Sequence, residues 1–459
     1  MKYVIRNIAK CEKMDEFVSV LQKLAHSNNW IEPEWYDKLG VKRGLRNKDG
    51  TGVLVGLTQI GEVHGYIMKE GEKIPDYGKL YYRGVDIEDI VEGCVADGRF
   101  GFEEVCFLLL FGKLPTESEL DTFNQILWSN RRLPNGFMED MILKAPSPNI
   151  MNKLARCTLA SYSYDESPDD MSLQAVLRRS IKLIARFPAF VAYSYQAKRH
   201  YYMDESLYIH LPKKGHSTAE CFLHMIRPDS SYTREEAEIL DLALILHAEH
   251  GGGNNSTFTT RVVTSTGTDT YSAIAAGIGA LKGPKHGGAN LKVTEMIEDI
   301  KANVPNWNDE AALRDYLVRI LKKEAFDKTG LIYGMGHAVY TLSDPRAVLL
   351  KDKARELAAL KGMEEEFALY DTIERISPEL FAEVKGSDKA LCANVDFYSG
   401  FVYKMLGIPS DLYTPLFAIA RVPSWCAHSM EEQISGGRII RPAYQTLKQI
   451  NEYKPLHAR

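Results

Sequence analysis

Apolar residues recur every three to four positions along most of the chain, which is the spacing of an amphipathic helix. Near the N-terminus, Met14, Phe17, Leu21 and Leu24 share one helix face with Val18. The same spacing returns much later in the chain at Leu313, Leu317, Ile320 and Leu321. The pattern therefore predicts a mainly helical protein.

Two further segments support this prediction. Thr116 and Glu119 have the spacing of a capping box, in which each side chain accepts a hydrogen bond from the other residue's backbone N–H. A helix should therefore follow through residues 123–127. The segment 103–111 is almost entirely apolar, which indicates a buried helix.

One region departs from the helical spacing. Residues 52–68 and 79–85 are rich in β-branched residues and glycine and partly alternate, which predicts a small strand or hairpin near the N-terminus. Residues 70–76, which include Gly71 and Pro75, are expected to form a loop.

The composition excludes several classes of protein. Of the 459 residues, 45% are hydrophobic and 25% are charged, which is typical of a folded chain with more than one domain. The net charge of −5 argues against a nucleic-acid partner, and no apolar run reaches the roughly 18 residues that span a membrane. The seven scattered cysteines form no CxxC pair and are expected to be free thiols. Since the N-terminus resembles neither a signal nor a transit peptide, a cytoplasmic protein with no membrane partner is predicted.

Candidate chemistry begins in the segment HAEHGGGN at 247–254. His247 and His250 are three residues apart, so a metal site, a structural pair and a ligand site all stay open. The motif is not HExxH and has no further ligand at metal-binding spacing. The glycines would let a ligand approach the backbone closely.

Two more histidines are flanked by glycine. His286 lies in GPKHGGAN (283–290), where the small neighbours should leave its ring exposed at a turn. His337 lies in GMGHAV (334–339), nine residues before Arg346, whose planar guanidinium could hold a carboxylate beside that ring. The alternatives are a structural histidine and a solvated surface arginine.

Asp396 lies between apolar and aromatic residues in NVDFYSG (394–400). Partial desolvation would raise its proton affinity and suit a general base, whereas its alternative role is the N-cap of the next helix. Arg421 and Arg441 both follow apolar residues, an unusual place for a charge unless it meets an anion. Together these residues suggest proton abstraction and carbonyl polarisation on a multiply anionic substrate, without a metal.

In this order, these segments resemble the catalytic segments of citrate synthases. The resemblance runs from Tyr82-Arg83-Gly84 and 103–116 to Arg441-Pro442, and its most specific parts are GPKHGGAN, GMGHAV with the DPR at 344–346, and the NVD at 394–396. It implies a mainly α, two-domain helical fold of the citrate synthase type with a small β element near the N-terminus. The implied parts are an N-terminal helical arm (1–45), a large domain in two pieces (46–290 and 406–459) and a small domain (291–405).

The resemblance also implies roles for the three central residues. Asp396 would remove a proton from the methyl group of acetyl-CoA, His286 would stabilise the enol or enolate, and His337 would polarise the ketone of oxaloacetate. Hydrolysis of citryl-CoA would then give citrate and CoA. No cofactor is implied, since acetyl-CoA is a substrate.

Substrate binding and assembly are implied in the same way. The residues expected to bind oxaloacetate are His250, Arg346, Arg421 and Arg441, the last reaching the partner's site in a homodimer. Contacts to CoA are expected from Ile332, Gly334, Met335, Gly336, Ala338, Lys385 and Lys389.

Three alternatives stay open. A 2-methylcitrate synthase would use the same residues on propionyl-CoA, because one methylene changes binding in a pocket by only ~1–3 kcal/mol. A non-catalytic homologue would bind CoA or a dicarboxylate, although His286, His337 and Asp396 are all present. A metal hydrolase would use His247 and His250.

Overall fold

The computed structural model describes residues 11–47, 50–69, 72–386 and 390–458. Contacts within the chain divide it into two units, Met1–Val55 and Gly56–Arg459. The first unit contains the helices α2 (Cys11–Asn29) and α3 (Glu34–Lys38), so the helix predicted near the N-terminus is confirmed. The boundaries expected at residues 45, 290 and 405 stay predictions.

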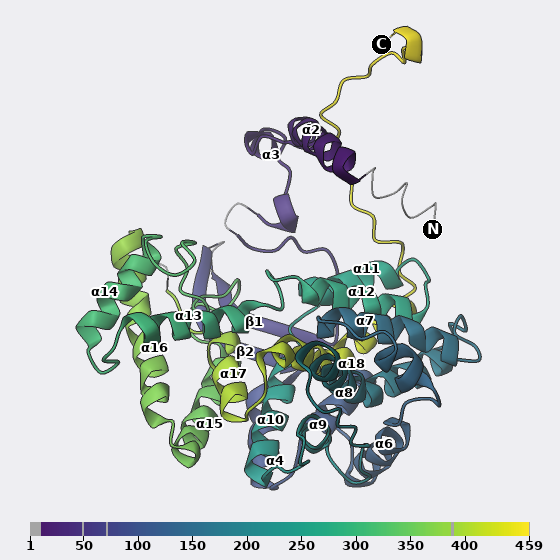
Figure 1. The fold of residues 1–459 in the computed structure, drawn as a ribbon, viewed down its shortest axis with the longest axis vertical. Helices are drawn as coiled ribbons and strands as arrows, with labels where there is room; N and C mark the ends of the chain where they lie inside the picture. Colours follow the sequence, from purple (N-terminus) through teal and green to yellow (C-terminus); the bar gives the residue numbers. More distant parts are fainter. Residues whose placement is uncertain (1–10, 48–49, 70–71, 387–389, 459) are drawn as a thin grey trace. The chain divides into compact units, whose positions relative to one another are not determined.

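The second unit is mainly helical with one small sheet, which confirms the predicted fold class (Figure 1). Its helices are α4 (Ile87–Ala96), α5 (Phe102–Phe111), α6 (Glu117–Asn130), α7 (Ile150–Ala160), α8 (Leu173–Met203), α9 (Thr218–Ile226), α10 (Arg234–His247), α11 (Asn255–Thr264), α12 (Thr270–Lys282), α13 (Ala289–Asn303), α14 (Glu310–Leu321), α15 (Pro345–Lys361), α16 (Glu364–Lys385), α17 (Val395–Met405) and α18 (Tyr413–Ile434). The antiparallel strands of the sheet are β1 (Gly61–Lys69), β2 (Glu72–Tyr82) and β3 (Val85–Asp86).

The helices predicted from local sequence signals are present in the structure. The Thr116 side chain accepts from the Glu119 N–H at 3.3 Å, and the Glu119 carboxylate accepts from the Thr116 N–H at 2.9 Å, so α6 begins with the predicted capping box. Helix α5 is buried from Phe102 to Leu110. The predicted apolar face of α14 is also buried, at Leu313, Leu317, Ile320 and Leu321.

The hairpin is confirmed, but its extent differs from the prediction. Strand β1 begins only at Gly61, and residues 53–58 form no regular structure. Strand β2 already begins at Glu72, so the loop predicted at 72–76 is wrong, while residues 70 and 71 lie outside the described residues. Pro75 is tolerated within β2 because β3 pairs only with the far end of that strand, and a proline fits a strand with an unpaired edge.

The hairpin packs closely on the loop between His337 and Arg346. The Gly78 N–H donates to Ser343 Oγ at 3.0 Å. A Cβ on Gly78 would overlap the carbonyl oxygen of Ser343, and one on Gly65 would overlap that of Val339. Glycine is therefore required at both strand positions for this close approach.

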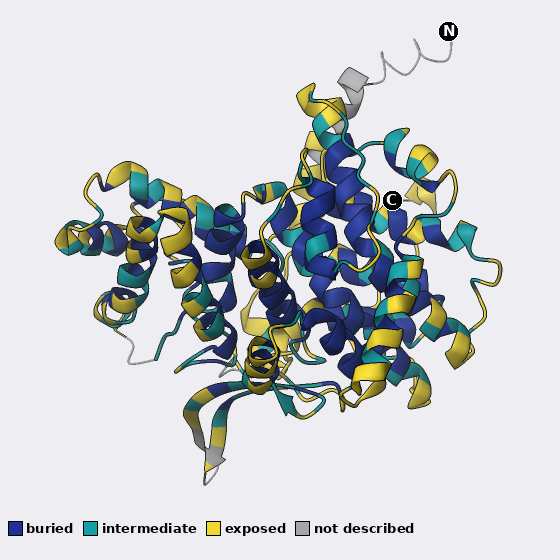
Figure 2. Ribbon diagram, turned by 90° about the horizontal axis from the view of Figure 1, so that it is seen from below, coloured by how far each residue is buried: buried dark blue, intermediate teal, exposed yellow. Residues whose placement is uncertain are grey.

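Helix α18 lies at the centre of the core. It packs against α5, α8, α10, α11 and α12, and Figure 2 shows the buried residues gathered along the inner helices of the unit. Trp425 and Arg421 on this helix are completely buried. An arginine is seldom placed in a core without a charged or polar partner, so its position points to function.

Helices α13 to α17 pack mainly on one another, while α15 and α17 also contact α10. Within the described residues, no helix is both long and apolar enough to cross a membrane. Six cysteines are free thiols: Cys94, Cys106, Cys157, Cys221, Cys392 and Cys426.

Candidate active site

His250 and His337 are neighbours although they are far apart in the sequence. Their ring centroids are 5.0 Å apart in an edge-to-face arrangement, and the Tyr340 ring stacks on His337 at 4.8 Å. His250 follows the end of α10, whereas His337 lies in the loop that leads to α15. The structure therefore brings together two of the histidines predicted from their glycine neighbours.

The backbone fixes the tautomer of His337. Its Nδ1 accepts hydrogen bonds from the N–H groups of Val339 and Tyr340, both at 3.1 Å. Because Nδ1 is an acceptor, the proton of the neutral ring is on Nε2. In this tautomer, His337 Nε2–H is a hydrogen-bond donor.

His286 is held in the opposite tautomer. It lies in the turn between α12 and α13, where its Nε2 accepts from the Ser256 N–H at 3.3 Å and lies 3.1 Å from Ser256 Oγ. Its Nδ1 therefore carries the proton. Burial, with a contribution from Arg421, lowers the pKa of His286 to about 4, so the ring is a neutral donor at neutral pH.

Asp396 lies in the first turn of α17. The cap of this helix is Asn394, whose side chain accepts from the Asp396 N–H at 3.0 Å, so the alternative interpretation of Asp396 as the N-cap is wrong. Burial raises the pKa of Asp396 to about 6, although Arg346 opposes the shift. A carboxylate with this proton affinity is suited to act as a general base near neutral pH.

Arg346 is fixed by its own helix cap. Asp344 caps α15 by accepting from the Arg346 N–H at 3.0 Å. The same carboxylate accepts from Arg346 Nε at 3.0 Å and from Nη2 at 2.7 Å, and the guanidinium lies over the Tyr340 ring. A bidentate pair of this kind holds the guanidinium plane rigidly.

Arg421 is buried but has no such partner. Its Nε donates to the His247 carbonyl oxygen at 2.7 Å, while Nη1 and Nη2 have no hydrogen-bond partner among the described residues. Burial lowers the pKa of Arg421 to about 10, and Glu249 opposes this shift. Two unpaired donors on a buried cation are costly unless an anion binds them.

The charges of the site arginines act on the pKa values of the site histidines. Burial lowers the pKa of His250 well below its usual value, and Arg346, His337, Arg421 and His286 add to the shift. The His247 ring instead stacks on Phe417 at 4.3 Å. In the described parts of the chain, no three side chains that could ligate a metal lie together, so His247 and His250 have no third ligand there.

Arg441 is not brought to this site. It is exposed on the extended segment after α18, where the neighbouring Ile440 N–H donates to Ser265 Oγ at 3.0 Å. Within the described residues, Arg441 is not among the charges that shift the pKa of Asp396 or His250.

Comparison with known proteins decides the family. The family model described as citrate synthase, C-terminal domain, matches residues 48–443. The chain belongs to the citrate synthase family. The citrate synthase of Haloferax volcanii is 34% identical, over 88% of this chain and 94% of the relative. The 2-methylcitrate synthase of Shewanella oneidensis is also 34% identical, over 79% and 87%.

Solved structures agree with this membership. The citrate synthase of Thermoplasma acidophilum, solved as a ternary complex with carboxymethyl coenzyme A and oxaloacetate, has a TM-score of 0.73 at 27% identity and covers 91% of this chain and 99% of its own. The family and fold class predicted from the sequence are thereby confirmed, and the chain is an enzyme of the citrate synthase family.

The segment predicted to contact CoA is hydrogen-bonded to the extended segment that precedes Asp396. The Gly336 N–H donates to the Cys392 carbonyl oxygen at 2.7 Å, and the Asn394 N–H donates to the Gly334 carbonyl oxygen at 2.8 Å. Asn394 Nδ2 also donates to the Gly336 carbonyl oxygen at 2.9 Å. Met335 pairs with Ala393 in an isolated bridge. The expected CoA segment and the segment that leads to the expected base are therefore joined by backbone hydrogen bonds.

The remaining predicted CoA contacts are placed differently. Ile332 is buried, whereas Ala338 is exposed. Lys385 Nζ donates to the Leu321 carbonyl oxygen at 2.7 Å, which ties it to the end of α14. Lys389 lies outside the described residues. Contact with CoA stays a prediction for all of them.

Three further residues shape the site, although no sequence pattern singled them out. Ser256 orients His286, Asp344 fixes Arg346, and Glu249 lies beside Arg421. Glu249 and Ser256 flank the glycine run at 251–253, so their closeness to His250 was a usable signal. Nothing in the sequence alone pairs Ser256 with a histidine 30 residues later.

Proposed function

We propose that this enzyme condenses acetyl-CoA with oxaloacetate and releases citrate and CoA. The observation that supports this most strongly is the combination of groups in one place. Asp396, a carboxylate with a raised pKa, is an electrostatic neighbour of Arg346 and Arg421, and the ring proton lies on Nδ1 of His286 and on Nε2 of His337. Two buried arginines supply positive charge for a dianionic substrate.

The first step is enolisation of acetyl-CoA. Asp396 removes a proton from the methyl carbon, and the electron pair moves to the thioester oxygen. Because a carboxylate is a weak base for a carbon acid, the developing oxyanion must meet a donor that is already in place. His286 Nδ1–H supplies this donor, since Ser256 holds the other ring nitrogen.

The second step forms the carbon–carbon bond. The enol carbon attacks the ketone carbon of oxaloacetate while His337 Nε2–H donates to the ketone oxygen, which becomes the hydroxyl of citryl-CoA. Arg346 and Arg421 bind the substrate carboxylates, with His250 beside them. Water then cleaves the thioester C–S bond, which gives a carboxylate and the thiol of CoA.

The nearest alternative is 2-methylcitrate synthase activity, because relatives with both names are 34% identical to this chain. We expect kcat/KM to be higher for acetyl-CoA than for propionyl-CoA, each measured with oxaloacetate. Equal or better turnover of propionyl-CoA would assign the 2-methylcitrate reaction instead.

The pKa of Asp396 predicts the acid side of the pH profile. The base must be ionised, so kcat/KM for acetyl-CoA should fall below a pH of about 6. At one unit below that pKa the rate should be about tenfold lower. His286 should add no second limb between pH 5 and 7, because its pKa is lowered to about 4. A profile that is flat down to pH 5 would contradict Asp396 as the base.

We further propose a cytoplasmic homodimer in which Arg441 completes the partner's oxaloacetate site. Arg441 is exposed in its own chain. The segment that follows it carries exposed apolar residues at every third position: Tyr444, Leu447, Ile450, Tyr453 and Leu456. Such a row supports docking on a second subunit, because isolated extended segments rarely keep so many apolar side chains in water. The free thiols suit a reducing compartment.

Mixed dimers test this arrangement. Arg441→Ala and Asp396→Ala subunits should each be inactive alone but should recover activity when mixed, because one site of the mixed dimer then contains both intact residues. Recovery should approach one quarter of wild-type activity if subunits exchange at random. Mixed dimers that stay inactive after proven exchange would mean that Arg441 serves its own subunit.

A further inference from the structure

We propose that Glu249 is a positioning residue for oxaloacetate, which keeps the Arg421 guanidinium charged without pairing with it. The inference rests on the function proposed above. Arg421 could not bind a substrate carboxylate if a protein carboxylate already occupied its two Nη groups. Glu249 supplies the negative charge nearby, while other donors hold its oxygens.

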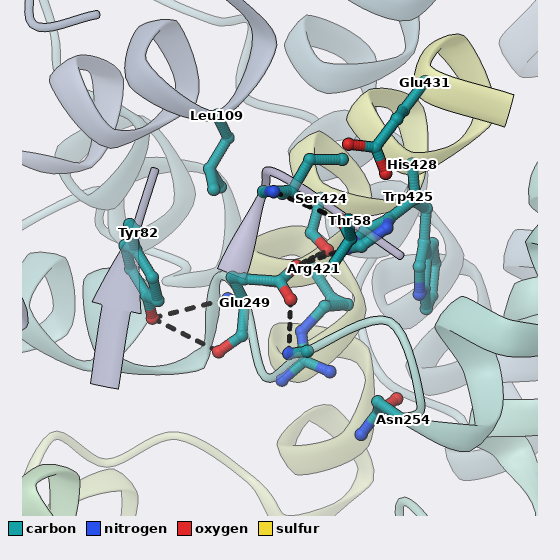
Figure 3. Close-up of polar contacts among 12 residues, drawn as sticks. Thr58, Tyr82, Leu109, Glu249, Asn254, Arg421, Ser424, Trp425, His428 and Glu431 are labelled. Atoms are coloured by element: carbon teal, nitrogen blue, oxygen red, sulfur yellow. Dashed lines mark hydrogen bonds and ion pairs between the residues drawn. The ribbon is translucent and has the colours of Figure 1, made fainter. Parts of the chain in front are cut away.

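The Glu249 side chain is completely buried, and both of its carboxylate oxygens accept hydrogen bonds (Figure 3). One oxygen accepts from the Gly251 N–H. The other accepts from Ser424 Oγ and from His428 Nε2, the latter at 3.2 Å. Ser424 and His428 follow Arg421 on α18 by three and seven residues, so all three lie on one face of this helix. This face therefore carries the Arg421 cation and the two side chains that donate to the Glu249 carboxylate.

His428 is itself oriented from outside the site. Its Nδ1 accepts from Arg261 Nη1 at 2.8 Å, which leaves Nε2–H to donate to Glu249. Arg261 also pairs with Glu431 at 2.8 Å and with Glu432 at 3.3 Å. The donors around Glu249 are therefore fixed by a chain of contacts that does not include Arg421.

The hairpin seals Glu249 from water. Tyr82 Oη accepts from the Glu249 N–H at 3.4 Å and donates to the Ile245 carbonyl oxygen at 2.9 Å. A Cβ on Gly61 would lie only 2.6 Å from Glu249 Cγ. A charge enclosed in this way acts on its neighbours through a low dielectric, so its influence on Arg421 is strong.

Arg346 and Arg421 differ in how a carboxylate lies near each of them, and this difference supports the positioning role of Glu249. Arg346 has a bidentate carboxylate partner in Asp344, whereas no carboxylate among the described residues pairs with Arg421. Burial alone would raise the pKa of Glu249, but His428, Arg421 and Ser424 lower it to about 2, so it is ionised. Burial lowers the pKa of Arg421, and Glu249 makes the largest opposing contribution.

The test is the alkaline limit of oxaloacetate binding, measured as Kd between pH 8 and 10.5. Wild-type binding should weaken near a pH of about 10, where Arg421 loses its proton. In Glu249→Gln the same weakening should begin about one pH unit lower or more, because the nearby negative charge is gone. Ser424→Ala is the matched control: it removes one hydrogen bond to Glu249 but keeps the charge, so its limit should stay at the wild-type pH.

Other titratable groups around Arg421 do not produce this shift. They are Tyr82, Arg346, Asp396, His247, His250 and His286. The pKa of Tyr82 and that of Arg346 are raised, while Asp396 titrates near a pKa of about 6. The pKa values of His247, His250 and His286 are lowered, which leaves their rings neutral in this range.

A second measurement covers the case in which Glu249→Gln does not fold. The double variant Glu249→Gln/Arg421→Met removes both charges. Its Tm should be close to that of Arg421→Met, because neither variant contains an unpaired buried cation. The inference is overturned if Glu249→Gln keeps the same alkaline limit as Ser424→Ala, or if the second substitution fails to restore folding. A wild-type enzyme that neither binds oxaloacetate nor releases CoA would instead contradict the proposed function.

Discussion

Replacing Asp396 by alanine should lower kcat for condensation by about 10²–10⁴-fold, which is the usual contribution of a general base. Burial raises the pKa of this carboxylate to about 6, and Arg346 and Arg421 are the cations that act on it. Oxaloacetate binding should change by less than about twofold, because Arg346 and Arg421 lie on other helices and keep their positions. Kd measured by calorimetry and kcat measured by CoA release separate the two effects. Turnover within about tenfold of wild type would assign the base elsewhere.

The isosteric variant Asp396→Asn is the control for this experiment, since it keeps the shape and the Asn394 cap. It should be equally inactive but more stable at pH 8 by about 1–2 kcal/mol, because a desolvated charge is removed from a partly exposed site. The folded-state pKa of Asp396, about 6, lies above its ordinary value of 3.8, so ionisation costs stability as the pH rises through this range. The stability gain should therefore disappear below a pH of about 4.

Replacing His286 by alanine should lower kcat by about 10²–10³-fold, the effect of removing one preorganised donor to an oxyanion. The enolate would lose the Nδ1–H that Ser256 directs toward it by holding Nε2. Oxaloacetate affinity should change little, whereas His337→Ala should weaken it as well, because His337 lies against His250 at the proposed oxaloacetate site.

Ser256→Ala is the matched control for His286. It removes Oγ but keeps the backbone N–H that fixes the tautomer, so its kcat should fall by less than about tenfold. If Ser256→Ala were as damaging as His286→Ala, the hydroxyl would carry the chemistry. A His286→Ala enzyme with near wild-type kcat would remove this histidine from the mechanism.

Much of the helical architecture could be predicted because its signals are local. The capping box at Thr116 and the apolar segment 103–111 specify their helices through neighbours three and four residues away. The strand boundaries could not be predicted as well. They depend on which residues of the hairpin meet across the turn, and the short extent of β3 leaves Pro75 free to lie within β2.

The site residues could be predicted in kind but not in arrangement. His286 and His337 were found through their glycine neighbours, yet only the fold shows that they are held in opposite tautomers, by Ser256 and by the Val339 and Tyr340 N–H groups. The sequence places Glu249 next to His250, but its position beside Arg421 could not be predicted, because Glu249 and Arg421 are 172 positions apart and share no motif. Contacts between residues so far apart depend on the tertiary structure, and local sequence spacing cannot predict them.

The most direct measurement of the proposed function is the stoichiometry of products from the purified protein with acetyl-CoA and oxaloacetate. Free CoA should appear only when both substrates are present, and citrate should form in equal amount. Folded protein that binds oxaloacetate but releases no CoA, or that releases CoA without forming citrate, would contradict the assigned reaction.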